Sequence, residues 1–187
     1  MIAIMSDWIE ALAAMLGPDK PVEAGTTLFC QGDEVRHMYV VRSGCVHLVR
    51  YGKDGSSAVM QRAEAPAALA ESSVFSPNYH CDGLCISDSV VARAEVASVR
   101  KALDEQPELQ RKLTMHLARE VQRTRSRLEL LNRRTVAERL DGWLALNDGA
   151  LPMRGQWRSV AEDIGVSPEA FYRELQRRRG SAAGTAA

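Results

Sequence analysis

The chain has 187 residues and a formal net charge of zero, with 24 Lys and Arg against 24 Asp and Glu. Its 45% apolar and 26% charged residues are typical of a globular protein and exclude a disordered chain. No apolar run reaches the roughly 20 residues that a membrane helix needs, and an N-terminus with Asp7 and Glu10 but no basic region does not resemble a signal peptide. We therefore expect a cytoplasmic protein whose four cysteines are thiols or ligands rather than disulfides.

The charge is divided unevenly between the two halves of the chain. Residues 1–100 carry 8 Lys and Arg against 12 Asp and Glu, a net charge of −4, whereas residues 101–187 carry 16 against 12, a net charge of +4. This asymmetry is typical of a neutral or acidic module joined to one that meets a polyanion. A charged, solvated face would give the same totals.

The first half of the chain has the pattern of short strands. Segments rich in β-branched and aromatic residues are separated by turn signals, and they lie at 26–30, 37–41, 45–51, 57–62 and 90–96. Their spacing predicts a small antiparallel sandwich or barrel. An amphipathic helix is predicted before it, with one apolar face formed by Trp8, Ile9, Leu12 and Leu16.

The period of the apolar residues then changes. Asp104 and Pro107 predict the start of a helix, with the proline in its first turn. Apolar positions follow at spacings of three and four residues, a pattern typical of a helix that packs on another helix: Leu109, Leu113, Leu117, Val121, Thr124, Leu128 and Leu131. We predict a homodimer, with packing against its own domain as the alternative. The predicted interface residues are Leu113, Leu117, Val121, Thr124 and Leu128.

A second helical pattern lies near the C-terminus. After a short helix at 135–146, small Ala161 suits a helix crossing, and Gly165 supplies a tight turn in which a positive φ costs little. Ser167 is expected to cap a second helix, with Pro168 at its first position. This pattern predicts a helix-turn-helix that binds DNA, with a generic pair of antiparallel helices as the alternative.

The second helix of such a motif presents its N-terminal residues to base edges in the major groove. Glu169, Tyr172 and Arg173 are predicted on its outward face, where arginine can bond guanine and glutamate can accept from cytosine. Phe171 and Leu175 are predicted to face the core. Arg177, Arg178 and Arg179 suit phosphates, or else complement the helix dipole. The predicted DNA-binding residues are Ser167, Glu169, Tyr172, Arg173, Arg177 and Arg178.

The order of these parts resembles the CRP/FNR family of bacterial transcription regulators. The resemblance covers about residues 20–180, and its most specific parts are 25–55, LAESSVF at 69–75 and the helix-turn-helix. It implies an α+β fold with an N-terminal antiparallel, jelly-roll-like β-roll, a long central dimerisation helix and a C-terminal helix-turn-helix. The corresponding domains are residues 1–103, 104–133 and 134–187.

The resemblance also implies partners. It implies a homodimer on near-palindromic, double-stranded promoter DNA, with RNA polymerase as a further partner and no membrane. The family usually adds a β-hairpin wing after the second helix, but GSAAGTAA at 180–187 does not predict one. If the wing is trimmed or missing, the affinity for DNA is expected to be reduced.

In members of the family that bind a cyclic nucleotide, a Gly-Glu pair contacts the ribose and an Arg-Ser pair takes the phosphate. Here Glu71 matches the glutamate and Ala70 replaces the glycine, while Cys81 and Asp82 fall on the Arg-Ser positions. A phosphate site that loses its arginine and gains a carboxylate repels its ligand, so binding of a cyclic nucleotide is not expected. Thr124 falls where the central helix of the family meets the base. The predicted effector pocket is therefore Glu71, Cys81, Asp82 and Thr124.

The stretch NYHCDGLC at 78–85 holds three candidate metal ligands, His80, Cys81 and Cys85. Thiolate and imidazole suit zinc, copper or haem iron, and the carbon-monoxide-sensing haem members of the family take Cys and His ligands from a similar region. Cys81 could instead be a redox-sensing thiol, the β-roll could hold a small organic effector, or both cysteines could be packed as small apolar side chains. The sequence leaves the cofactor unknown.

The predicted function is a dimeric, DNA-binding transcription regulator whose β-roll senses an unidentified signal. The alternative is a haem, metal or thiol-redox sensor module with weak DNA binding. The sequence contains no G-x-S-x-G, H-E-x-x-H or P-loop motif, so we expect no enzyme and no catalytic residue.

Overall fold

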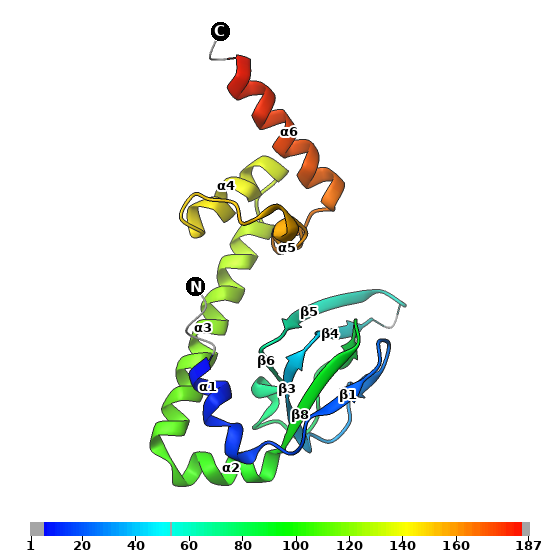
Figure 1. The fold of residues 1–187 in the computed structure, drawn as a ribbon, viewed down its shortest axis with the longest axis vertical. Coiled ribbons are helices and arrows are strands. Elements are labelled where there is room, and N and C mark those ends of the chain that lie inside the picture. The colour runs from blue at the N-terminus through cyan, green and yellow to red at the C-terminus, as the bar shows by residue number, and fades with distance from the viewer. Residues whose placement is uncertain (1–5, 53, 185–187) are drawn as a thin grey trace. The chain divides into compact units, whose positions relative to one another are not determined.

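The computed structural model describes residues 6–52 and 54–184, and the side chains of residues 8–52 and 54–180. Contacts between residues divide the chain into a first unit, residues 1–117, and a second unit, residues 118–187. All the strands lie in the first unit, and one long helix, α3 (Pro107–Leu131), contributes residues to both (Figure 1).

The strands of the first unit form two four-stranded antiparallel sheets. The first sheet has the order β1 (Lys20–Val22), β8 (Ser89–Glu95), β3 (His37–Ser43) and β6 (Ala67–Leu69). The second has the order β2 (Thr27–Phe29), β7 (Asp82–Cys85), β4 (Cys45–Tyr51) and β5 (Ser57–Glu64). The predicted antiparallel β-roll and the α+β fold are confirmed.

Each of the five predicted strands corresponds to a strand of the structure, namely β2, β3, β4, β5 and β8. The other three, β1, β6 and β7, are only three or four residues long. A segment of that length rarely carries a pattern that stands out from a loop, although β2, also three residues long, was predicted. The sequence therefore missed three of the four short strands that complete the sheets.

The core of the first unit lies between the sheets and under the N-terminal helix. Met38, Val40 and Val46 are fully buried there. Helix α1 (Ser6–Ala11) and the 3-10 turn η1 (Ala13–Met15) bury Trp8 and Leu12 against the same core, which confirms the predicted apolar face. The regular helix is shorter than predicted, because it ends at Ala11 and does not reach Leu16.

Helix α2 (Val96–Glu105) follows β8 directly and was not predicted. The prediction of a helix start at Asp104 was wrong, since this residue lies in the last turn of α2. The chain is extended at Gln106, and α3 begins at Pro107 as predicted. Proline lacks a backbone N–H and disfavours helical dihedrals at the residue before it, which explains the break between the two helices.

The second unit also contains α4 (Val136–Leu146), the 3-10 turn η3 (Arg154–Gln156), α5 (Trp157–Asp163) and α6 (Pro168–Gly184). Its core includes the fully buried Leu140, Ile164 and Phe171. The helix predicted at 135–146 is α4, and the Thr135 hydroxyl accepts from the Glu138 N–H in a complete capping box. In the described part of the chain, no helix is long and apolar enough to cross a membrane.

Candidate functional site

Helices α5 and α6 form the predicted helix-turn-helix. Ala161 is fully buried in α5, and its carbonyl accepts from the Val166 N–H in the turn. Gly165 has a φ of 65°, and a Cβ at this position would meet the Leu131 side chain. Both the dihedral and the space therefore require glycine in this turn.

One side chain that the sequence analysis missed holds the turn in place. The Arg139 guanidinium, from α4, donates to the carbonyl oxygens of Ile164 and Gly165 at 3.1 and 3.2 Å. It also donates to the carbonyl of Arg133 at 2.9 Å and to that of Leu131, at the end of α3, at 3.0 Å. A single cation thus fixes the end of α3, the start of α4 and the turn before α6.

The first turn of α6 is capped as predicted. The Ala170 N–H donates to the Ser167 hydroxyl at 3.2 Å, and Pro168 is the first helical residue. Hydrogen bonds from its own backbone N–H and from Ser167 lower the pKa of Glu169. The carboxylate is therefore ionised at neutral pH and can only accept hydrogen bonds.

The side chains of α6 are divided between the core and the solvent in the predicted way. Phe171 and Leu175 are buried, whereas Glu169, Tyr172 and Arg173 are exposed. The exposed residues come from the first two turns of the helix, the part that enters the major groove in a helix-turn-helix. Helix α6 continues through GSAAG to Gly184. The rest of the 180–187 tail, in which no wing was predicted, lies outside the described residues.

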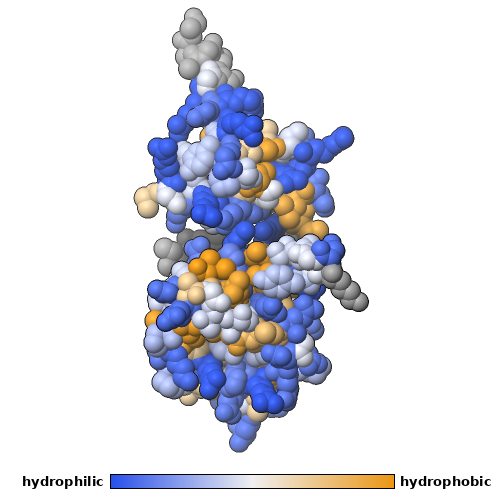
Figure 2. Space-filling view, turned by 90° about the vertical axis from the view of Figure 1, so that its right-hand side faces the viewer, coloured by the Kyte–Doolittle hydropathy of each residue, from blue (hydrophilic) through white to orange (hydrophobic). Residues whose placement is uncertain are grey.

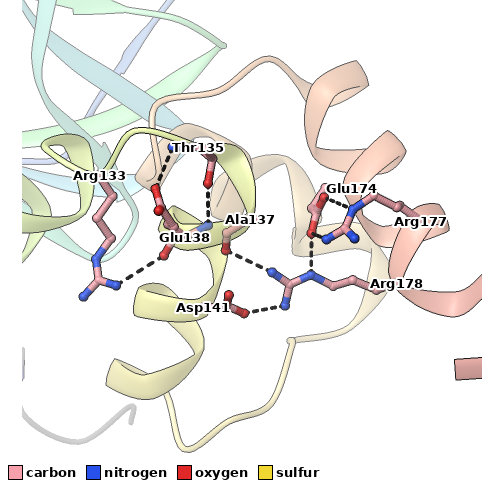
Figure 3. A network of polar contacts seen from close by, with 8 residues as sticks. All are labelled: Arg133, Thr135, Ala137, Glu138, Asp141, Glu174, Arg177 and Arg178. Carbon is pink, nitrogen blue, oxygen red and sulfur yellow. Dashed lines mark hydrogen bonds and ion pairs between the residues drawn. The ribbon is translucent and has the colours of Figure 1, made fainter. Parts of the chain in front are cut away.

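Two of the predicted phosphate contacts already have partners within the second unit (Figure 3). Glu174 is 8% exposed, and both Arg177 and Arg178 donate to it at 2.7 to 2.8 Å. Arg178 also donates to Asp141 at 2.6 Å and to the Ala137 carbonyl at 2.9 Å. Hydrogen bonds from Arg177, supported by Arg178, lower the pKa of Glu174 to about 2. This network attaches α6 to α4.

The structure does not bring the three candidate metal ligands together. Cys85 is buried in the core of the first unit, and Cys81 is half-buried at its margin. Cys81 lies in a bend just before β7, and Cys85 is the last residue of that strand. The His80 ring forms a hydrogen bond with the Ser76 hydroxyl at 3.1 Å. Within the described residues, no three His, Cys, Asp or Glu side chains are grouped as a metal would require.

The surroundings of the Cys81 thiol oppose its ionisation. Burial raises its pKa, Arg50 acts in the opposite direction, and Asp82 and Glu71 raise it further. Burial also raises the pKa of the Cys85 thiol. Both cysteines are therefore mainly protonated at neutral pH, which makes them poor nucleophiles.

Glu71, the residue at the family's ribose position, begins the 3-10 turn η2 (Glu71–Ser73) and is 6% exposed. One carboxylate oxygen lies 3.5 Å from His116 Nε2, and the other has no hydrogen-bond partner among the described residues. Ala70, in place of the family's glycine, keeps a left-handed φ of 63°, at a cost of about 1 kcal/mol for a residue with a Cβ. The backbone of this turn therefore has the conformation that glycine favours.

The other predicted effector residues are placed differently. Asp82, at the start of β7, accepts from the Gln31 N–H at 2.6 Å. Cys81 lies beside it, and both belong to the first unit with Glu71. Thr124 is an exposed residue of α3 and belongs to the second unit.

The predicted apolar positions of α3 differ in burial along the helix. Leu109 and Leu113 are buried in the core of the first unit, and Leu117 is half-buried against it. Farther along, Val121 is 48% exposed and Leu128 is 55% exposed, and Thr124 between them is exposed too. The first part of the stripe therefore packs within its own chain, and the second part is left uncovered.

Comparison with known proteins identifies the domain of the first unit. Residues 19–106 match the cyclic nucleotide-binding domain family. The Fumarate and nitrate reduction regulatory protein of Salmonella typhi is 20% identical over 136 residues, which are 73% of this chain and 54% of that protein. The chain therefore spans about half the length of this curated relative.

Solved structures share the fold over most of the chain. FixK2 from Bradyrhizobium japonicum matches with a TM-score of 0.68 and 20% identity, over 88% of this chain and 85% of that one. CLP of Xanthomonas campestris, a c-di-GMP responsive global regulator, matches with a TM-score of 0.63 and 17% identity, over 95% of this chain and 93% of that one.

These matches combine a cyclic nucleotide-binding domain with a fold shared over most of the chain. In both respects the chain is similar to regulators of the CRP/FNR type, in agreement with the resemblance seen in the sequence. Its relatives act in the regulation of transcription.

Proposed function

We propose that the chain is a dimeric, DNA-binding transcription regulator whose first unit senses a signal other than a cyclic nucleotide. The observation that carries the proposal is the exposed first part of α6. Glu169, Tyr172 and Arg173 face the solvent there, while the buried Phe171 fixes the helix against the core. Glutamate and arginine at these positions suit hydrogen bonds to cytosine and guanine edges.

The exposed part of the α3 stripe supports a dimer. Val121 and Leu128 are seven residues apart, so they lie on one face of the helix, and Thr124 lies between them on the same face. Leu131 is also exposed. A second copy of α3 would bury these side chains in the spacing of a coiled coil.

The electrostatics of the first unit support a ligand other than a cyclic nucleotide. Asp82 and Glu71 bring two carboxylates to the region where nucleotide-binding relatives hold ribose and phosphate. Arg50 is the cation whose effect on the Cys81 pKa is opposite to that of the two carboxylates. Its Nε already donates to the His80 carbonyl at 3.1 Å. A cyclic phosphate would meet net repulsion at this place.

The alternative is a sensor module that binds DNA weakly and responds through thiol chemistry, haem or a metal. The raised pKa of Cys81 weighs against a reactive thiol. Among the described residues, no three potential metal ligands are grouped, which weighs against a shared ligand set. We therefore favour the regulator with a colourless effector.

A mobility shift on promoter DNA and on random-sequence DNA, at two salt concentrations, tests the proposal. We expect a shift whose midpoint moves to higher protein concentration as salt rises, because phosphate contacts release counterions. The absence of any salt-dependent shift would overturn the proposal. Equal affinity for promoter DNA and random-sequence DNA would show that the protein binds DNA without sequence specificity.

A further inference from the structure

Two arginines of the second unit lie over the ring of a single tryptophan. The guanidinium carbon of Arg154 lies 5.9 Å from the ring centroid of Trp157, and that of Arg179 lies 5.7 Å from it. Both distances are within the range of a cation–π interaction. Arg154 comes from η3 and Arg179 from α6, so two separate segments each bring a guanidinium to the same ring.

The tryptophan is a rigid support for these two arginines. Trp157 is buried in the core of the second unit, and its Nε1–H donates to the Pro152 carbonyl at 3.0 Å. The edge of Phe171 contacts it, with ring centroids 6.3 Å apart. Because the ring cannot rotate freely, the guanidiniums that stack on it are held in place as well.

The charges of Arg154 and Arg179 are not neutralised locally. In the part of the chain that the structure describes, neither has a carboxylate within ion-pair distance, whereas nearby arginines do. Arg158 lies 3.2 Å from Glu162, and Arg177 lies 2.7 Å from Glu174. Each guanidinium therefore lacks a counter-charge among the described residues, and a bound phosphate would supply one.

The pair also adjoins the surface proposed to contact DNA. The Tyr172 ring lies 5.8 Å from the Trp157 ring. Tyr172 and Arg179 are seven residues apart on α6, which places them on one face two turns apart. Figure 2 shows that the surface along the C-terminal part of α6 is hydrophilic.

We infer that Arg154 and Arg179 form a phosphate-binding pair that contacts the DNA backbone beside the recognition helix. The inference rests on the proposed function. It keeps for Arg179 the phosphate contact that the sequence suggested, and it assigns to Arg154 the contact that the sequence suggested for Arg177 and Arg178. Guanidinium groups donate two parallel hydrogen bonds to a phosphate. Such contacts position the protein on the duplex and carry no sequence information.

The test is the salt dependence of DNA affinity for the full chain and its variants. Affinity for one fixed random-sequence duplex is measured between about 50 and 200 mM salt. Each phosphate contact adds about 0.9 to the steepness of log affinity against log salt, and a dimer carries the pair twice. In Arg154→Gln/Arg179→Gln we therefore expect the slope to become shallower by about 3 to 4.

Two matched variants make the result specific. Arg111→Gln removes the same charge from the first unit, where Arg111 pairs with Glu108 at 2.8 Å, and should leave the slope unchanged. Arg177→Gln measures the contribution of the arginine that Glu174 engages, for comparison with the double variant. Circular dichroism checks that each variant is folded. If the double variant unfolds, Arg154→Gln alone, in an exposed position, should still lower the steepness by about 2 in a dimer.

The outcomes separate this inference from the proposed function. If the unmodified protein shows no salt-dependent binding, the proposed function fails. If it binds but the double variant keeps the full slope, the phosphate-binding pair is refuted. If the slope falls in Arg177→Gln but not in the double variant, Arg177 contacts phosphate and Arg154 and Arg179 do not. That result would also refute the phosphate-binding pair.

Discussion

Replacing Glu174 with glutamine removes the negative charge on which two arginines of α6 converge. Hydrogen bonds from Arg177, supported by Arg178, lower the pKa of Glu174 from 4.5 to about 2. The folded protein therefore favours the ionised carboxylate more than the unfolded chain does. Its contribution to stability is fully present above the unfolded pKa and is lost as the pH falls towards the folded pKa.

The magnitude follows from the change in pKa and from exposure. A pKa lowered from 4.5 to about 2 corresponds to at most ~3 kcal/mol of stability. Arg177 is 64% exposed, so water screens its share of the interaction, and we expect Glu174→Gln to cost ~2 kcal/mol at neutral pH. Near pH 3 the unfolded carboxylate is mostly protonated, so the variant should then differ by less than ~1 kcal/mol.

Urea unfolding of both proteins between about pH 7 and pH 3 measures this difference. The fluorescence of Trp143 and Trp157, in the core of the second unit, follows the transition in a Trp8→Phe background. Glu129→Gln is the control, because Glu129 forms an exposed pair with Arg133 and should change stability little. A stability difference for Glu174→Gln that stays constant over this pH range would refute the ion-pair reasoning.

Four other predictions concern DNA binding, assembly, the turn and the cofactor. Arg173→Ala should reduce the preference for operator over scrambled DNA by ~1–3 kcal/mol with the fold intact; unchanged discrimination would show that another residue recognises the bases. Alanine at Leu117, Val121 and Leu128 together should give monomers in sedimentation, and a persistent dimer would place the interface elsewhere. Arg139→Met should lower the free energy of unfolding by ~1.5–3 kcal/mol, because it removes the hydrogen bonds that a charged group donates to four partly buried or exposed carbonyls; an unchanged urea midpoint would contradict this. Protein purified without oxygen should have a featureless visible spectrum, whereas a Soret band would establish haem.

Much of the fold was predictable because its signals are local. The capping residue Ser167, the proline after it and the positive φ of Gly165 each depend on neighbours within a few residues. Strands β3 and β4 are seven residues long each and rich in β-branched and aromatic residues, which is enough to recognise them. The short strands β1 and β6 depend instead on partners far along the chain, and propensity alone does not identify such segments.

The candidate site was predictable in part for the same reason. The exposed positions of α6 follow from helical spacing, so Glu169 and Arg173 could be named from the sequence. The pairing of Glu174 with Arg177 and Arg178 is also local, since they are three and four residues apart, and this spacing was a signal that could have been used. Arg139 and Trp157 act on residues that only the folded chain brings near them, and no short-range pattern indicates their roles.

Helix α3 has a segment that belongs to neither core. From Ala118 to Glu129 no side chain is buried, whereas Leu113 before it and Leu130 after it are. A helical stretch of this length has little stability of its own in water. In a dilute monomer the backbone amides of this segment should exchange with deuterium quickly, and association should slow them. Hydrogen exchange at these residues would thus report on dimer formation. The stiffness of the helix that joins the two units would then depend on protein concentration.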